Sequence, residues 1–197
     1  ACVILHSNLC DGSAAAAAGE LDNSTAVEGD IATEAGCASV LAQVQEQALT
    51  VDILVNNYGT ATFAQWDSAS TADWLDMYQK NVLSVARLVQ GLVPTMKRAR
   101  WGRIVNLGTI GSHRPGRTMP HYYAAKGALA NLGVSLAEDF PNPCGRLATR
   151  EDAVMVTTLD AHVPTLFADF SGSAEQRARL HEQFGDALTH SAVIGAT

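Results

Sequence analysis

The apolar positions of this chain form segments of two kinds, which alternate along the sequence. One kind is a short continuous apolar run, and the other is a longer stretch with helical spacing or helix-forming residues. The continuous runs predict buried strands at 2–6, 25–29, 51–56, 103–108 and 153–159. The longer stretches predict helices at 11–21, 33–48, 70–98, 120–139 and 173–187, the last within an otherwise loop-like tail. Because strands alternate with helices, the pattern predicts βαβ units and a parallel sheet wound with helices on both faces.

The composition is that of an ordinary globular domain. A length of 197 residues suits one domain, so we treat 1–197 as a single unit with 160–197 as the candidate substrate-loop region. The formal net charge of −7 argues against nucleic acid or an anionic membrane as the main partner. No apolar run approaches the ~20 residues that span a bilayer, and no leader with a cleavage site is recognisable.

Cysteine and histidine give no sign of a metal site. The four Cys are scattered without C-x-x-C or zinc spacing, and no His pair has metal-ligand spacing. Isolated thiols are typical of a reducing compartment, so we expect a cytoplasmic protein.

The main chemical signal lies between Thr109 and Lys126. Tyr122 and Lys126 are four residues apart on a predicted helix and therefore share a face. An ammonium beside a phenol lowers the tyrosine pKa from about 10 and makes it a usable general acid and base. Tyr123 competes for this role, since the i, i+3 spacing also shares a face. The alternative without chemistry is a surface Tyr–Lys pair.

Three further segments accompany this pair. The strand at 51–56 ends in Asn-Asn-Tyr-Gly, the long helix carries Asn81 within Gln-Lys-Asn-Val, and the strand at 103–108 precedes Thr109. In this order and at these spacings the segments resemble the classical short-chain dehydrogenase/reductase family, over roughly residues 1–140. The resemblance implies a Rossmann-like, doubly wound parallel sheet in three α/β/α layers. It also implies an NAD(P)-dependent oxidoreductase that interconverts an alcohol and a ketone by hydride transfer.

The resemblance assigns four catalytic positions. Tyr122 would be the general acid and base, and Thr109, where the family usually has Ser, would orient the substrate oxygen through its hydroxyl. Lys126 would lower the tyrosine pKa and bind the nicotinamide ribose. Asn81 would bend its helix and hold a water for proton relay. The alternatives are a spectator Thr at a strand end and an Asn tolerated on a helix surface.

Cofactor-binding positions are implied at two strand ends. Asp30 would receive the adenine amino group, with Ile31 packed nearby, although Asp at such a junction is equally an ordinary helix N-cap. The ribose of the adenosine would be lined by Asn57, Tyr58 and Gly59, where Tyr58 replaces the usual Ala and Gly59 allows close approach of the backbone.

The residues after the strand at 2–6 bear on the choice between NAD and NADP. Ser7, followed by Asn8, stands where an acidic residue would accept the ribose 2′-OH and repel a 2′-phosphate. No Arg follows to clamp a phosphate. We expect NADP or NAD, with NADP favoured.

Two features depart from the family pattern. The sequence has no G-x-x-x-G-x-G or G-x-G-x-x-G turn, and 2–6 matches the family's second strand. We therefore expect the first strand and the glycine-rich pyrophosphate turn to precede Ala1, because the first strand lies in mid-sheet and its loss would split the sheet. The final strand is also expected to be missing. Ala161 and His162 replace the usual Pro-Gly at the nicotinamide end.

The expected partners are a small carbonyl or alcohol substrate and further copies of the chain. The helices at 70–98 and 120–139 are apolar on more than one side, which predicts a homo-oligomer, a tetramer or a dimer. A catalytically silent scaffold subunit is the rival hypothesis, favoured by the absent glycine-rich turn. An extended-branch epimerase or dehydratase is a second rival, but those enzymes are longer and usually lack Asn-Asn-x-Gly.

Overall fold

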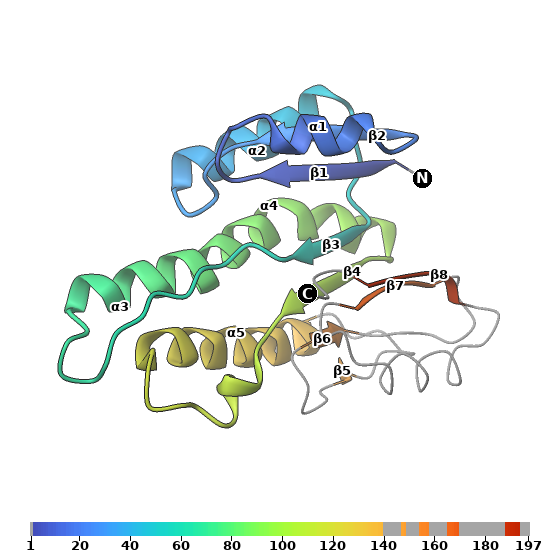
Figure 1. Ribbon diagram of the computed structural model, residues 1–197. Helices are drawn as coiled ribbons and strands as arrows, with labels where there is room; N and C mark the ends of the chain where they lie inside the picture. Colours follow the sequence, from blue (N-terminus) through green and yellow to red (C-terminus); the bar gives the residue numbers. More distant parts are fainter. Residues whose placement is uncertain (1, 140–146, 149–153, 158–164, 170–187, 194–197) are drawn as a thin grey trace.

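The computed structural model describes residues 2–139, 147–148, 154–157, 165–169 and 188–193 (Figure 1). The strands are β1 (Val3–Ser7), β2 (Ser24–Glu28), β3 (Ile53–Asn56), β4 (Arg103–Leu107), β5 (Leu147–Ala148), β6 (Val154–Thr157), β7 (Thr165–Asp169) and β8 (Leu188–Val193). The helices are α1 (Ser13–Gly19), α2 (Glu34–Glu46), α3 (Thr71–Tyr78), α4 (Ser84–Ala99) and α5 (Pro120–Asp139). A π-helical turn, η1 (Gln79–Leu83), joins α3 to α4, and a 3-10 turn, η2 (Ile110–Ser112), follows β4.

The alternation of strands and helices predicted up to residue 139 is confirmed, with boundaries shifted by a few residues. Local signals explain where the helices begin. The Thr33 side chain accepts a hydrogen bond from the Gly36 amide and caps α2. Ser70 and Asp73 form a capping box at the start of α3. The predicted helix at 70–98 is one continuous helical segment, interrupted only by the π turn.

Two parallel strand pairs form the framework of the site. β1 pairs with β2, and β3 pairs with β4, but the two pairs lie in separate sheets. No described strand lies between β1 and β3, which agrees with the split expected for a sheet without its central strand. One hydrophobic core nevertheless runs through both pairs and includes Val27 of β2, Val40 of α2, Leu54 of β3, Val89 of α4 and Ile104 of β4. Helix packing therefore holds the two pairs together.

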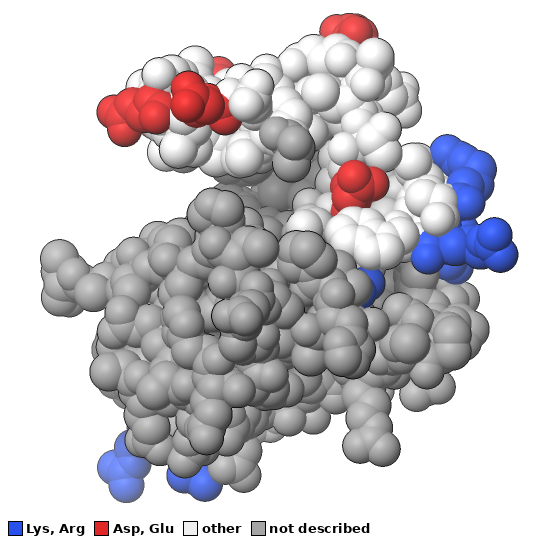
Figure 2. Space-filling model, turned by 90° about the vertical axis from the view of Figure 1, so that its right-hand side faces the viewer, with Lys and Arg blue, Asp and Glu red and all other residues white. Residues whose placement is uncertain are grey.

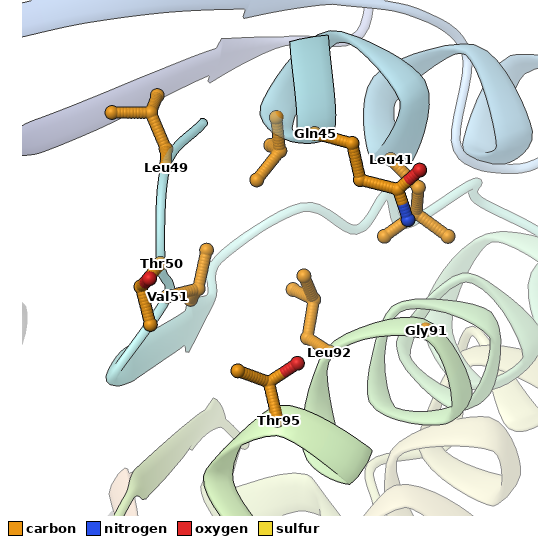
Figure 3. A pocket seen from close by; sticks show the side chains of 9 residues that line it. Leu41, Gln45, Leu49, Thr50, Val51, Gly91, Leu92 and Thr95 are labelled. Atoms are coloured by element: carbon orange, nitrogen blue, oxygen red, sulfur yellow. The ribbon is translucent and has the colours of Figure 1, made fainter. Parts of the chain in front are cut away.

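A small cavity lies in this helical layer. It has a volume of about 60 Å³ and lies between α2, α4 and the segment that leads into β3 (Figure 3). Leu41, Leu49, Val51 and Leu92 give it apolar walls. None of the candidate site residues lines it, and its lining also includes the exposed residues Gln45 and Thr50.

The predicted strand at 153–159 is present as β6, but its direction differs from the expected parallel sheet. β6 runs antiparallel to β4, and β5 runs antiparallel to β6. β5, the first described strand after α5, is therefore parallel to β4. β6 lies between β4 and β5 in the sheet and runs opposite to both of them.

The tail corrects a second expectation. Loop and helix were predicted for 160–197, yet β7 and β8 pair in parallel there as a separate two-stranded sheet. Their sequences, TLFAD and LTHSAV, contain β-branched and aromatic residues that favour strands. The predicted helix at 173–187 and the pair Ala161-His162 lie outside the described residues.

Candidate active site

Tyr122 and Thr109 lie side by side where β4 meets α5. Tyr122 is in the first turn of α5 and packs against a small cluster of Met77, Val82 and Ala125. Thr109 caps the 3-10 turn that follows β4, where its hydroxyl accepts a hydrogen bond from the Gly111 amide. Burial raises the pKa of Tyr122 above its ordinary value, and the Thr109 hydroxyl beside it opposes that rise. The two hydroxyls therefore form one polar site in partly apolar surroundings.

The structure separates Tyr122 from its competitor Tyr123. The Tyr123 ring is wedged against Gly111, where a Cβ would collide with it. It also makes a tilted contact with the Tyr122 ring, with centroids 5.5 Å apart. Tyr123 thus has a packing role at the η2 turn, while Tyr122 is the tyrosine beside Thr109.

Lys126 is buried, with 6% of its surface exposed. Its Nζ donates a 2.8 Å hydrogen bond to the Leu107 carbonyl at the end of β4. Burial lowers the pKa of Lys126 to about 8. The expected lowering of the Tyr122 pKa by this ammonium is not seen, because burial dominates at both groups and the ammonium is directed at a backbone carbonyl.

Asn81 lies in the π turn, so the helix is locally distorted at this residue as expected. Its Nδ2 donates to the Thr60 carbonyl at 2.9 Å and to the Met77 carbonyl at 3.0 Å. Its Oδ1 is buried without a hydrogen-bond partner in the described part of the chain. A buried amide oxygen of this kind calls for a donor, and a water or a ligand hydroxyl would supply one.

Gly59 brings Asn81 and Lys126 together. A Cβ at this position would lie 2.5 Å from Asn81 Oδ1 and 3.4 Å from Lys126 Nζ. Glycine is therefore required here by a close approach of the backbone to both polar side chains. The Asn-Asn-x-Gly segment and the two helix positions recognised in the sequence meet at one place.

A hydrogen-bonded pair of asparagines that was not predicted from the sequence joins the ends of β3 and β4. Asn56 and Asn106 are register partners on β3 and β4, and Asn56 Nδ2 donates to Asn106 Oδ1 at 2.8 Å. Both are buried. The signal was an Asn at the end of each of two neighbouring strands. This contact fixes the segments that begin at Asn57 and at Leu107.

The second cluster lies at the ends of β1 and β2. Asn8 Nδ2 donates to Asp30 Oδ1 at 2.8 Å, and the Ile31 amide donates to Asn8 Oδ1 at 2.8 Å. The N-cap of α2 is Thr33, so the alternative assignment of Asp30 as that cap is wrong. Asp30 instead accepts from the Ala32 amide at 3.0 Å and holds its own turn.

Ser7 has a carboxylate neighbour that the sequence analysis did not single out. Ser7 Oγ donates to Asp11 Oδ1 at 3.2 Å and accepts from Ser13 Oγ at 3.0 Å. The hydrogen bonds from Ser13 are the main reason that the pKa of Asp11 is lowered. The only sequence signal was an Asp four residues after Ser7 in the loop that leads into α1.

Tyr58 and Asn57 differ in their surroundings. Tyr58 packs against the main core and has a raised pKa, first through burial and then through the nearby Asp30 carboxylate. Lys80 opposes that rise. Asn57 is exposed. Tyr58 therefore lies within the electrostatic influence of Asp30.

Comparison with known proteins places the chain in a family. Residues 1–143 match the sequence model described as short chain dehydrogenase. The chain belongs to this family, and its α/β fold agrees with that assignment.

Curated relatives include two bacterial reductases. The chain is 32% identical over 103 residues to the 3-oxoacyl-(acyl-carrier-protein) reductase FabG of Haemophilus influenzae, covering 51% of this chain and 42% of the relative. It is 32% identical over 119 residues to the rhamnolipids biosynthesis 3-oxoacyl-(acyl-carrier-protein) reductase of Pseudomonas aeruginosa, covering 58% and 46%. The chain thus spans less than half the length of these relatives.

Solved structures show the same fold. L-sorbose reductase from Gluconobacter frateurii, complexed with NADPH and L-sorbose, is 29% identical with a TM-score of 0.66 over 70% of this chain and 54% of that one. A short-chain dehydrogenase from Streptomyces avermitilis is 26% identical with a TM-score of 0.64 over 70% and 51%. Among the described residues, no helix is long and apolar enough to cross a membrane. No group of three His, Cys, Asp or Glu that could hold a metal ion occurs among them either.

Proposed function

We propose that this chain is part of an NAD(P)-dependent oxidoreductase that interconverts an alcohol and a ketone. The observation that carries the proposal is the convergence of Thr109 with Tyr122, and of Asn81 with Lys126 around Gly59. The cluster lies at the carboxyl ends of the parallel strands β3 and β4, where open α/β sheets bind their ligands.

The residues present fit a nicotinamide nucleotide. Lys126 offers a buried ammonium, Gly59 leaves open backbone beside it, and Asn81 Oδ1 lacks a donor. Lys126 and Asn57 would hold ribose hydroxyls, and Asp30 and Ile31 would hold the adenine. When bound, the nicotinamide supplies or takes up the hydride.

The chain's own residues would handle the proton. In the reduction direction, the Tyr122 hydroxyl donates its proton to the carbonyl oxygen as that oxygen gains negative charge, and Thr109 holds the same oxygen by a hydrogen bond. The raised pKa of Tyr122 keeps it protonated as a donor. The free Oδ1 of Asn81 holds the water through which the proton is replaced.

Ser7 by itself favours NADP, but we infer a preference for NAD from the carboxylate beside it. Asp11 places a carboxylate on Ser7, at the position where the ribose 2′ substituent is read. Residues 1–79 contain eleven Asp or Glu and no Lys or Arg. Figure 2 looks onto the opposite end of β1 and β2, away from Ser7 and Asp11, and acidic side chains are seen over that part of the molecule as well. A 2′-phosphate would be repelled by the Asp11 carboxylate there.

The rival is a silent subunit that binds the nucleotide and performs no chemistry. One experiment distinguishes the two hypotheses. It measures NADH binding by fluorescence and NADH oxidation with a panel of ketones. Binding with turnover of at least one ketone supports the oxidoreductase. Binding without turnover of any ketone, and without NAD reduction by the matching alcohols, supports the silent subunit. An epimerase or dehydratase would convert its substrate with no net change in NADH.

The remaining proposals concern the whole protein. We take 1–197 as one domain with 160–197 at the substrate, and the partners as a small carbonyl or alcohol and further copies of the chain. Leu75, Tyr78 and Val134 are apolar residues exposed on α3 and α5, which favours assembly through these helices into a dimer or tetramer. Light scattering that gives a monomer at micromolar concentration would contradict this. A cytoplasmic location rests on the isolated cysteines and is checked by fractionation.

A further inference from the structure

The Asn8 carboxamide makes a bidentate contact at the end of β2. It donates to Asp30 Oδ1 and accepts from the Ile31 amide, both at 2.8 Å. These partners are 22 and 23 residues away in the sequence, so the contact joins two separate loops. The Asp30 carboxylate, an acceptor, and the Ile31 backbone N–H, a donor, thus bind the same planar side-chain amide.

The same pair matches the edge of an adenine. The amino group of adenine is a donor and the adjacent ring nitrogen is an acceptor. A carboxamide likewise carries one donor beside one acceptor, so either group can make the same two hydrogen bonds to Asp30 and Ile31. A backbone N–H has a single hydrogen to donate. While Asn8 Oδ1 accepts it, no base can.

The Asp30–Ile31 pair is also held in place without Asn8. The Ala32 amide donates to Asp30 Oδ1, and the Ala32 carbonyl accepts from Gln79 Nε2 at 2.7 Å and from Arg87 Nη1 at 3.2 Å. Gly36 packs so closely on the Asp30 backbone that a Cβ there would collide with it. Anchors on α2, η1 and α4 therefore preform the pair, so Asn8 is dispensable for its geometry.

We propose that Asn8 is an internal competitor that occupies the adenine-reading pair Asp30–Ile31 and must be displaced when a dinucleotide binds. This inference rests on the proposed function and adds a determinant of cofactor affinity to it. Displacement reduces the apparent affinity by the fraction of molecules in which the pair is open.

The test compares Asn8→Ala with the wild-type chain in equilibrium titrations with two probes. NADH carries the adenine edge, whereas reduced nicotinamide hypoxanthine dinucleotide has the donor and acceptor exchanged at that edge. Removing the competitor should tighten NADH binding by about tenfold, as expected for loss of a hydrogen bond to a charged group. Binding of the hypoxanthine probe should stay within twofold. Leu9→Ala is the matched control, since Leu9 is an exposed neighbour in the same loop.

A second readout separates competition from a merely structural role. Asn8→Ala should lower the urea midpoint of the nucleotide-free protein slightly, because a link between two loops is lost, while NADH binds more tightly. Weaker or unchanged NADH binding by the variant overturns the inference, and equal tightening for both probes does the same. If the wild-type chain and the variant bind neither probe, the proposed function itself fails, and this inference with it.

Discussion

The two ends of the candidate site obtain their polar partners in different ways. At the catalytic end, Lys126 and Asn81 are 6% and 0% exposed and are held by backbone carbonyls of β4 and of the helix. At the proposed adenosine end, Asp30 is exposed, and its partner is the Asn8 side chain, while Asp11 accepts a hydrogen bond from Ser7. Burial fixes the first end, and hydrogen bonds between loops fix the second. Substitutions should therefore have large effects on chemistry and stability at the catalytic end and modest effects on affinity at the other.

The sharpest test of this comparison is Tyr122→Phe. The substitution keeps the ring that packs on Met77 and removes the group proposed to transfer the proton. General acid–base catalysis is typically worth ~10²–10⁴-fold, so kcat with NADH and a ketone should fall by that factor while NADH affinity stays within twofold. Tyr123→Phe is the control and should be mild. An inactive Tyr123→Phe with an active Tyr122→Phe would reverse the assignment.

Lys126 should make stability depend on pH. Its folded pKa of about 8 lies below the ordinary 10.5, so between these values the unfolded chain binds more protons. The free energy of unfolding should therefore rise with pH above about 8, by at most about 3 kcal/mol. Urea unfolding at pH 7, 8 and 9.5 measures the slope.

Lys126→Met is the control for this slope. The variant should be more stable than the parent at pH 7, because no charge is buried, and its stability should not rise over the same range. It should also lose NADH affinity if Lys126 holds the ribose. A parent whose stability is flat or falls from pH 7 to 9.5 would contradict the low pKa.

Thr109 tests whether the hydroxyl or the shape matters. Thr109→Val keeps the shape but removes the hydroxyl beside Tyr122 and the cap of η2. The kcat should therefore fall by about 10²-fold, the lower end of the loss typical of a donor aimed at developing charge. Thr109→Ser restores the hydroxyl and should retain most of the activity. Equal activity of the valine variant and the parent in the ketone assay would remove Thr109 from the mechanism.

The smallest expected effect is at Asp11. Asp11→Asn removes the carboxylate on Ser7 and should tighten NADPH binding relative to NADH by about three- to tenfold, a modest factor because exposed charges are well screened by solvent. Asp22→Asn changes the net charge equally at the turn before β2 and serves as the control. Fluorescence titration with both nucleotides gives the ratio. An unchanged ratio would show that Asp11 does not read the 2′ position.

Local periodicity is enough to predict the elements of the first 139 residues. Strands and helices up to residue 139 follow from apolar runs and from helical spacing, whereas the N-cap of α2 is Thr33 and not the Asp30 that the sequence offered. The shared face of Tyr122 and Lys126 needs only four residues of one helix. The family signature was likewise readable because each of its segments lies at the end of a predictable element.

Contacts between groups that are distant in the sequence depend on long-range packing. The contacts of Asn8 with Asp30 and of Asn56 with Asn106 span 22 and 50 residues, and no local pattern specifies them. The antiparallel insertion of β6 is likewise a long-range choice of strand partner. The low pKa of Lys126 also arises from packing, because desolvation depends on what covers the side chain and not on its neighbours in the sequence.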